Sequence, residues 1–142
     1  MERVPRQVLV QRNSVRSATF MAKTCVIGEA DPFIGRLLRR FAEQSGLQVS
    51  RAELGQDVLH LVRQARPDVI ILEPELPGQM RGWEAVRAIR SDPAGHPIPI
   101  VVCSWLTEAE ARALIGDVSG YLKKPDLHYP DFAAVLKQAG VT

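Results

Sequence analysis

Residues 68–78 read DVIILEPELPG, and this stretch decides the fold. Residues 69–72 form a continuous apolar run. Such a run is typical of a central strand in a parallel sheet, where helices cover both faces and no polar alternation remains. We therefore expect residues 69–72 to form a buried parallel strand that ends at Glu73.

Strand-like and helix-like patterns alternate on both sides of this run. The other predicted strands are residues 25–27, 47–52, 98–103 and 121–122. The predicted helices run from Asp31 and Pro32 to Gly46, around residues 59–62 up to Pro67, over 83–90, from Thr107 and Glu110 to Gly116, and over 131–138. Five strands alternating with five helices predict a doubly wound α/β domain with a five-stranded parallel sheet, because right-handed crossovers leave few other arrangements.

Length and composition are those of one globular domain. The chain has 142 residues, of which 46% are hydrophobic and 24% charged. No apolar run approaches the ~20 residues that span a bilayer, so we expect a cytoplasmic protein without a membrane partner. Cys25 and Cys103 lie in apolar runs and are predicted to be buried free thiols.

The first 21 residues differ from the rest of the chain. Residues 1–20 contain four Arg and one Glu, a net charge of +3, which leaves −1 for the remainder of a chain whose net charge is +2. We expect residues 1–21 to be a flexible basic extension and residues 22–142 to be the folded domain. A weakly acidic domain with a short basic tail does not have the composition of a nucleic-acid reader.

Polar residues follow the predicted strands at the edge where doubly wound folds place their sites. In such folds the site lies outside the carboxyl ends of the strands, near the point where the strand order reverses. The segments to inspect are residues 28–32, 73–78, 104–105 and 123–125.

Four of these features together resemble the receiver domain of two-component response regulators. Residues 29–32 (EADP) resemble the family's acidic cluster, and residues 72–78 (LEPELPG) resemble the segment with its phosphoacceptor. Ser104 matches the switch Ser/Thr, and residues 121–125 (YLKKP) match the lysine–proline motif. The resemblance covers residues 23–138 and implies a flavodoxin-like sheet with strand order 2-1-3-4-5.

The family's chemistry needs an acceptor carboxylate, carboxylates that hold Mg²⁺ and a lysine. Here the phosphoacceptor position is Glu73, where the family has aspartate. The extra methylene moves the carboxylate by about an ångström, and a misplacement of that size costs about 100-fold in a positioned reaction. Lys124 matches the lysine.

The matching metal site is also altered. Ala30 stands where the family has its key metal-binding aspartate, which leaves Glu29, Asp31 and Glu75 as the candidate ligands. The loss of a ligand should cost at least the ~10–100-fold seen for outer-shell losses. We expect no required cofactor and at most weak Mg²⁺ binding.

The positions near the switch leave alternatives open. Trp105 follows Ser104, where the family usually has a small residue, so it either packs into the domain and crowds the aromatic Tyr121 or presents an apolar face to a partner. Glu73 and Lys124 either satisfy each other as a charge pair, or Glu73 partly imitates a phosphorylated aspartate. The loop 77–82 is one residue longer than the usual family pattern.

We expect a stand-alone pseudo-receiver, a signalling adaptor rather than an enzyme, because no effector domain follows Thr142 in this sequence. The expected partner is a protein such as a histidine kinase, a receptor or an effector, or a second copy that docks on the face of the fourth helix, fifth strand and fifth helix. The residues expected on that face are Glu108, Arg112, Gly120, Lys123, Phe132 and Lys137, with Trp105 and Tyr121 at its edge.

Two rival functions stay open. The first is an active Mg²⁺-dependent phosphoacceptor of a phosphorelay that uses an unorthodox acid. The second is a small-ligand-binding flavodoxin-like module, although the sequence has no glycine-rich phosphate loop.

Overall fold

The computed structural model describes residues 22–142, and within them five strands alternate with five helices. The strands are β1 (Thr24–Gly28), β2 (Gln48–Ala52), β3 (Val69–Leu72), β4 (Ile100–Ser104) and β5 (Gly120–Lys123). The helices are α2 (Pro32–Gln44), α3 (Gly55–Ala65), α4 (Gly82–Ser91), α5 (Glu108–Ile115) and α6 (Tyr129–Gln138). The predicted alternation is confirmed. The predicted extension lies outside the described residues.

All strand pairs are parallel, and the strands lie in the order β2-β1-β3-β4-β5. Both the fold class and the strand order are as predicted. The strand expected from Ile98 begins instead at Ile100, because Ile98 lies between two prolines and its N–H bonds Gly95 O at 3.1 Å. The last helix begins two residues earlier than expected, with Pro130 in its first turn.

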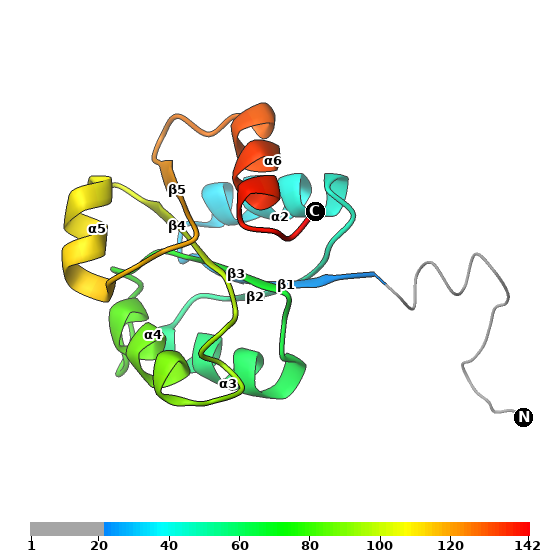
Figure 1. Ribbon diagram of the computed structural model, residues 1–142. Helices are drawn as coiled ribbons and strands as arrows, with labels where there is room; N and C mark the ends of the chain where they lie inside the picture. The colour runs from blue at the N-terminus through cyan, green and yellow to red at the C-terminus, as the bar shows by residue number, and fades with distance from the viewer. Residues whose placement is uncertain (1–21) are drawn as a thin grey trace, which may run out of the picture.

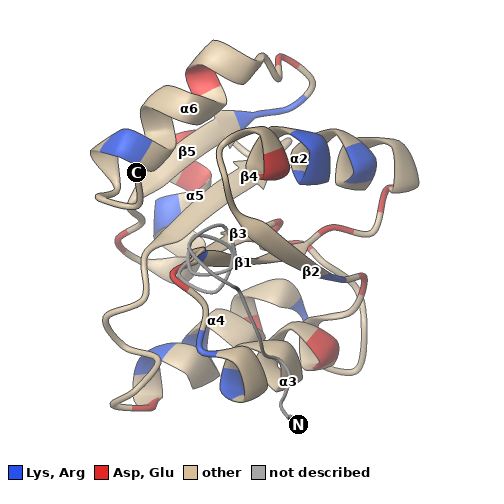
Figure 2. Cartoon of the chain, turned by 90° about the vertical axis from the view of Figure 1, so that its right-hand side faces the viewer, with Lys and Arg blue, Asp and Glu red and all other residues tan. Residues whose placement is uncertain are grey.

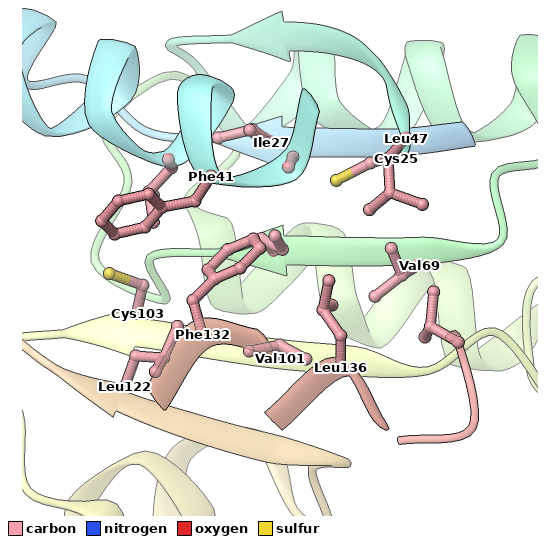
Figure 3. Packing of buried hydrophobic residues seen from close by; sticks show 14 of the residues in the cluster. Cys25, Ile27, Phe41, Leu47, Val69, Val101, Cys103, Leu122, Phe132 and Leu136 are labelled. Atoms are coloured by element: carbon pink, nitrogen blue, oxygen red, sulfur yellow. The ribbon is translucent and has the colours of Figure 1, made fainter. Parts of the chain in front are cut away.

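Helices cover both faces of the sheet and enclose two apolar clusters (Figure 1). α2 and α6 cover one face, where Phe41 and Phe132 pack with ring centroids 5.5 Å apart (Figure 3). α3, α4 and the end of α5 pack on the other face. Phe132 is therefore a core residue, and its expected place on the outer face was wrong, because it lies one turn from the buried Leu136 on the inner side of α6.

The two cysteines lie in the cluster under α2 and α6, and both are free and buried (Figure 3). Burial raises the pKa of Cys25 and Cys103 to about 12. Both side chains therefore stay protonated thiols at neutral pH and act as small apolar core residues.

Local signals fix several helix starts. Asp31 caps α2 by accepting hydrogen bonds from Phe33 N and Ile34 N, and Thr107 and Glu110 form the predicted capping box of α5. No side chain caps α3, but Gly55 N donates to Pro77 O at 2.9 Å. A Cβ at residue 55 would lie 2.0 Å from Met80 O, so the loop 77–82 packs directly on the first turn of α3.

Lys and Arg lie on helices of both layers and are interspersed with Asp and Glu (Figure 2). The positive charge of the described chain is therefore spread over both faces. Within residues 22–142, no helix has the length and hydropathy that crossing a membrane requires.

Candidate functional site

The carboxyl edge of the sheet holds a compact group of buried polar side chains. Glu29 follows β1, Glu73 follows β3, Ser104 ends β4 and Lys124 follows β5. Each is at most 7% exposed. The parallel strands bring residues from four separate segments to one edge, which is the position expected for a site in a doubly wound fold.

Lys124 is the centre of this group. Its Nζ lies 2.7 Å from Glu29 Oε1 and 3.1 Å from Glu73 Oε1. Burial by itself would lower the pKa of Lys124, but the hydrogen bond and charge of Glu29, together with Glu73, outweigh it and raise that pKa. Lys124 therefore stays charged and offsets two buried carboxylates.

The second oxygen of Glu73 is also occupied. Ser104 Oγ donates a hydrogen bond to Glu73 Oε2 at 2.7 Å, and Glu75 N donates to the same oxygen at 3.0 Å. Three groups therefore hold the carboxylate, one of them a cation. Charge-assisted hydrogen bonds of this kind are about twice as strong as neutral ones, so Glu73 is fixed in one orientation.

The loop after β1 is held by Glu29 and by an arginine from the edge strand. Glu29 Oε2 accepts a hydrogen bond from Asp31 N at 3.0 Å, whereas Oε1 has only its ion pair with Lys124 among residues 22–142. Arg51 of β2 donates to Glu29 O at 3.1 Å and to Asp31 O at 3.3 Å. A Cβ on Gly35 of α2 would lie 2.3 Å from the Arg51 guanidinium, so the glycine makes room for it.

The loop after β4 connects this group to the surface. Ser104 Oγ, which donates to Glu73, also accepts a hydrogen bond from Leu106 N at 3.1 Å. The Tyr121 hydroxyl donates to Leu106 O, and Lys123 Nζ donates to Trp105 O. Trp105 itself is 57% exposed, so of its two predicted placements the structure shows the outward one.

The candidate metal ligands do not converge. Asp31 is exposed and uses its carboxylate to cap α2, and the bond from Ile34 N, with that from Phe33 N, lowers the pKa of Asp31. Glu75 is exposed, and Ala30 offers no ligand. Among residues 22–142, no group of three or more His, Cys, Asp or Glu side chains could hold a metal ion.

The space between Glu29 and Glu73 is filled by the Lys124 ammonium rather than left for a cation. Mg²⁺ requires near-octahedral oxygen coordination, and Glu29 is the only candidate ligand that is buried at this position. The residues present do not fit the Mg²⁺ that the resemblance implies.

Arg51 is the site residue that the sequence reasoning missed. It lies in a half-buried strand and appears there as an ordinary charged residue on the solvent side. Gly35, a glycine inside a helical pattern, is the signal that could have pointed to it, because such a glycine often marks a close approach by another group.

Comparisons with known proteins find one family of similar domains. The sequence profile of the response regulator receiver domain matches residues 25–129. The polar-differentiation response regulator DivK of Brucella anthropi is 29% identical over 119 residues, which cover 82% of this chain and 95% of DivK. The response regulator GacA of Pseudomonas aeruginosa is 32% identical over 106 residues, covering 73% of this chain but only 49% of GacA.

Solved structures show the same fold. The chemotaxis response regulator CheY4 of Vibrio cholerae superposes with a TM-score of 0.75 at 23% identity and covers 84% of this chain and 99% of its own. The receiver domain of a sensor histidine kinase from Pseudomonas aeruginosa PAO1, solved with a magnesium ion in its active site cleft, has a TM-score of 0.73 at 20% identity. That superposition covers 84% of this chain and 98% of the kinase receiver.

Proposed function

We propose that this chain, which belongs to the response regulator receiver domain family, is a signalling adaptor that binds a protein partner without being phosphorylated. One observation carries the proposal. Both carboxylate oxygens of Glu73 are already bonded, to Lys124 on one side and to Ser104 and Glu75 N on the other.

Phosphoryl transfer needs an acceptor oxygen that is free to attack in line and a cation that neutralises the developing charge. In this chain Glu73 is only 7% exposed, so an incoming phosphodonor would have little access to its carboxylate. The magnesium-bound kinase receiver contains the ion in its cleft, whereas in this chain the ammonium of Lys124 lies between the two buried carboxylates. These facts support an inert acceptor.

The bonds of Glu73 also support a fixed conformation of the surface above it. The Ser104 hydroxyl donates a hydrogen bond to Glu73 and accepts one from Leu106 N, and the Tyr121 hydroxyl donates to Leu106 O. The Glu73 carboxylate supplies one negative charge, whereas a phosphoryl group adds roughly two. The hydrogen bonds of Glu73, however, form without phosphorylation. The loop at Trp105 would therefore be presented permanently to a partner.

Trp105 is the proposed anchor of that contact. Its side chain is 57% exposed, and the exposed ion pair of Arg112 with Glu108 lies on the helix that follows. An exposed aromatic residue with a charged rim has the composition of a small transient interface. The proposed face consists of α5, β5 and the outer side of α6, and either a protein partner or a second copy would dock on it.

Incubation with acetyl phosphate and Mg²⁺, followed by intact-mass measurement, tests the inert acceptor. We expect no added phosphoryl mass. Glu73→Gln is the matched control, because it keeps the side-chain length and removes the acceptor. A phosphoryl adduct on the wild type that is lost in Glu73→Gln would show an active phosphoacceptor instead.

Trp105→Ala tests the interface. We expect it to weaken self-association, measured by sedimentation, or binding of a purified partner by about 2 kcal/mol or more, the usual threshold for an anchor residue. Phe33→Ala is the control, since Phe33 is an aromatic residue 67% exposed on α2. If only Phe33→Ala weakens association, or if Trp105→Ala lowers only the melting temperature, the interface lies elsewhere.

A further inference from the structure

A groove between α4 and α5 lies outside the site described above. Its volume is about 260 Å³, and its apolar lining comprises Trp83, Val86, Leu114 and Ile115. The two helices lie next to each other at one flank of the domain (Figure 1). Val86 is buried and forms part of the floor, whereas Leu114 is 38% exposed. An apolar surface is thus open to solvent beside α5.

The packing of α5 leaves this groove open. The helix has eight residues, and Ala111 is its one buried side chain. Most of the stability of a helix in a protein comes from packing its apolar face on the core. With one buried side chain, α5 gains little stability in this way. A partner that covered Leu114 and Ile115 would bury apolar surface that the domain itself leaves partly exposed.

The charge in the groove has one sign. Arg87 and Arg90 line it, and no carboxylate of residues 22–142 does. The guanidinium of Arg87 lies 4.9 Å from the centroid of the Trp83 ring, and Arg87 has no ion-pair partner within residues 22–142. Arg90 donates to His96 O and Ile98 O, which are neutral acceptors, and it too has no ion-pair partner in the described part of the chain.

Among the described residues, no nearby carboxylate forms a direct ion pair with these arginines. Glu84 accepts a hydrogen bond from Arg81 N, and Asp92 accepts one from Ala94 N. On α5, Glu108 pairs with Arg112, and Glu110 accepts a hydrogen bond from Thr107 N. The groove therefore offers an apolar floor and an unpaired cation that stacks on an aromatic ring.

The geometry points to this groove as the docking site for an acidic amphipathic segment of a protein partner. One large apolar side chain of that segment would enter between Trp83 and Leu114, and a neighbouring carboxylate would bind Arg87. A guanidinium presents paired donors that match a carboxylate, and the stacking on Trp83 pre-orients them. This inference deepens the proposed function, since it rests on a protein partner and names the chemistry of one segment of it.

The probe is a fluorescein-labelled synthetic peptide that forms an amphipathic helix of Leu and Glu, titrated against the full chain by fluorescence anisotropy. A peptide with Lys in every Glu position is the control ligand. We expect the acidic peptide to bind and the basic one to fail. We also expect the affinity to fall with added salt, because exposed charge pairs are screened. Amide chemical-shift changes should map to α4 and to the end of α5.

Arg87→Glu should weaken binding of the acidic peptide about tenfold or more, equivalent to about 1.4 kcal/mol. Arg87→Gln should cause a smaller loss of affinity for the acidic peptide. Leu114→Ala should also lower this affinity but leave its salt dependence unchanged. Arg40→Glu is the matched control, an exposed arginine on the opposite layer, and should bind like the wild type. Circular dichroism verifies that each variant is folded.

The inference is overturned if the acidic peptide does not bind, if Arg87→Glu leaves its affinity unchanged, or if the shifts map elsewhere. It is also overturned if Arg87→Glu changes only self-association, since the occupant is then a second copy of the chain. The phosphorylation test is independent of these results. An adduct on Glu73 with intact peptide binding refutes the phosphorylation-independent function but leaves the groove as assigned.

Discussion

Replacement of Lys124 by methionine should destabilise the domain strongly. Methionine keeps most of the length of the stem and removes the charge. The Lys124 side chain is 3% exposed, and those of Glu29 and Glu73 are 3% and 9% exposed, so little water can take over from the ammonium. Removal of one partner from a buried ion pair costs about 3–5 kcal/mol. Because this one ammonium offsets two carboxylates, we expect the upper part of that range.

A loss of about 5 kcal/mol is a large fraction of the 5–15 kcal/mol that stabilises a typical domain. Urea unfolding at pH 7, followed by far-UV circular dichroism, measures it as a lower midpoint at an unchanged slope. Lys137→Met is the control, because Lys137 is exposed on α6 and should change the free energy by less than about 0.5 kcal/mol. Glu29→Gln and Glu73→Gln added to Lys124→Met should recover part of the loss.

The pH dependence provides a second test. Because the pKa of Lys124 is raised above its ordinary value of 10.5, its stabilisation is complete below that value and is lost as the pH rises through the folded-state pKa. The wild type should therefore lose stability above about pH 10.5, and Lys124→Met should lack this contribution. A loss below about 1 kcal/mol at pH 7 would refute the reasoning, since the carboxylates would not depend on Lys124.

Three further predictions concern other features. Glu73→Asp alone should stay almost inert to acetyl phosphate, whereas Ala30→Asp added to it should restore Mg²⁺ binding, measured by Trp fluorescence; tight Mg²⁺ binding by the wild type would show that Ala30 is no defect. In an Arg51→Ala background, Gly35→Ala should stabilise the protein by about 0.5–1 kcal/mol, because Ala favours the helix more than Gly does. In the wild type the gain should be smaller, because the new Cβ displaces Arg51; equal gains in both backgrounds in urea unfolding would disprove the contact. Deletion of residues 1–20 should change the free energy of unfolding by less than about 1 kcal/mol, and a large fall in melting temperature would contradict this.

Local sequence signals predicted most of the fold. The apolar run at residues 69–72 became β3, and the caps at Asp31 and Thr107 became helix starts, because each depends on neighbouring residues alone. Phe132 was misplaced because a shift of one or two residues in the helical phase decides whether a side chain faces the core or the solvent. Its partner Leu136 shows the correct phase in the structure.

The sequence predicted only those site residues that belong to the motifs of the receiver family. Glu73, Ser104 and Lys124 were found through the resemblance, but their mutual bonds depend on distances between strand ends that no local pattern contains. Arg51 was missed because its partners are backbone carbonyls of a neighbouring strand's loop. The exposure of Trp105 was undecidable from sequence, since it depends on how Tyr121 and Lys123 hold the loop beneath it.

The contact between Gly55 and the loop 77–82 has a consequence for how this domain can be recombined with its relatives. Any side chain at residue 55 would collide with the backbone at Met80 and Arg81, and a backbone cannot swing aside as a side chain can. The first turn of α3 and the loop after β3 therefore fit each other only as a matched pair, although about 20 residues separate them in the sequence. A chimera that takes only one of these two segments from a relative should lose the close contact at Gly55 and be destabilised. A chimera that takes both segments from the same relative should fold.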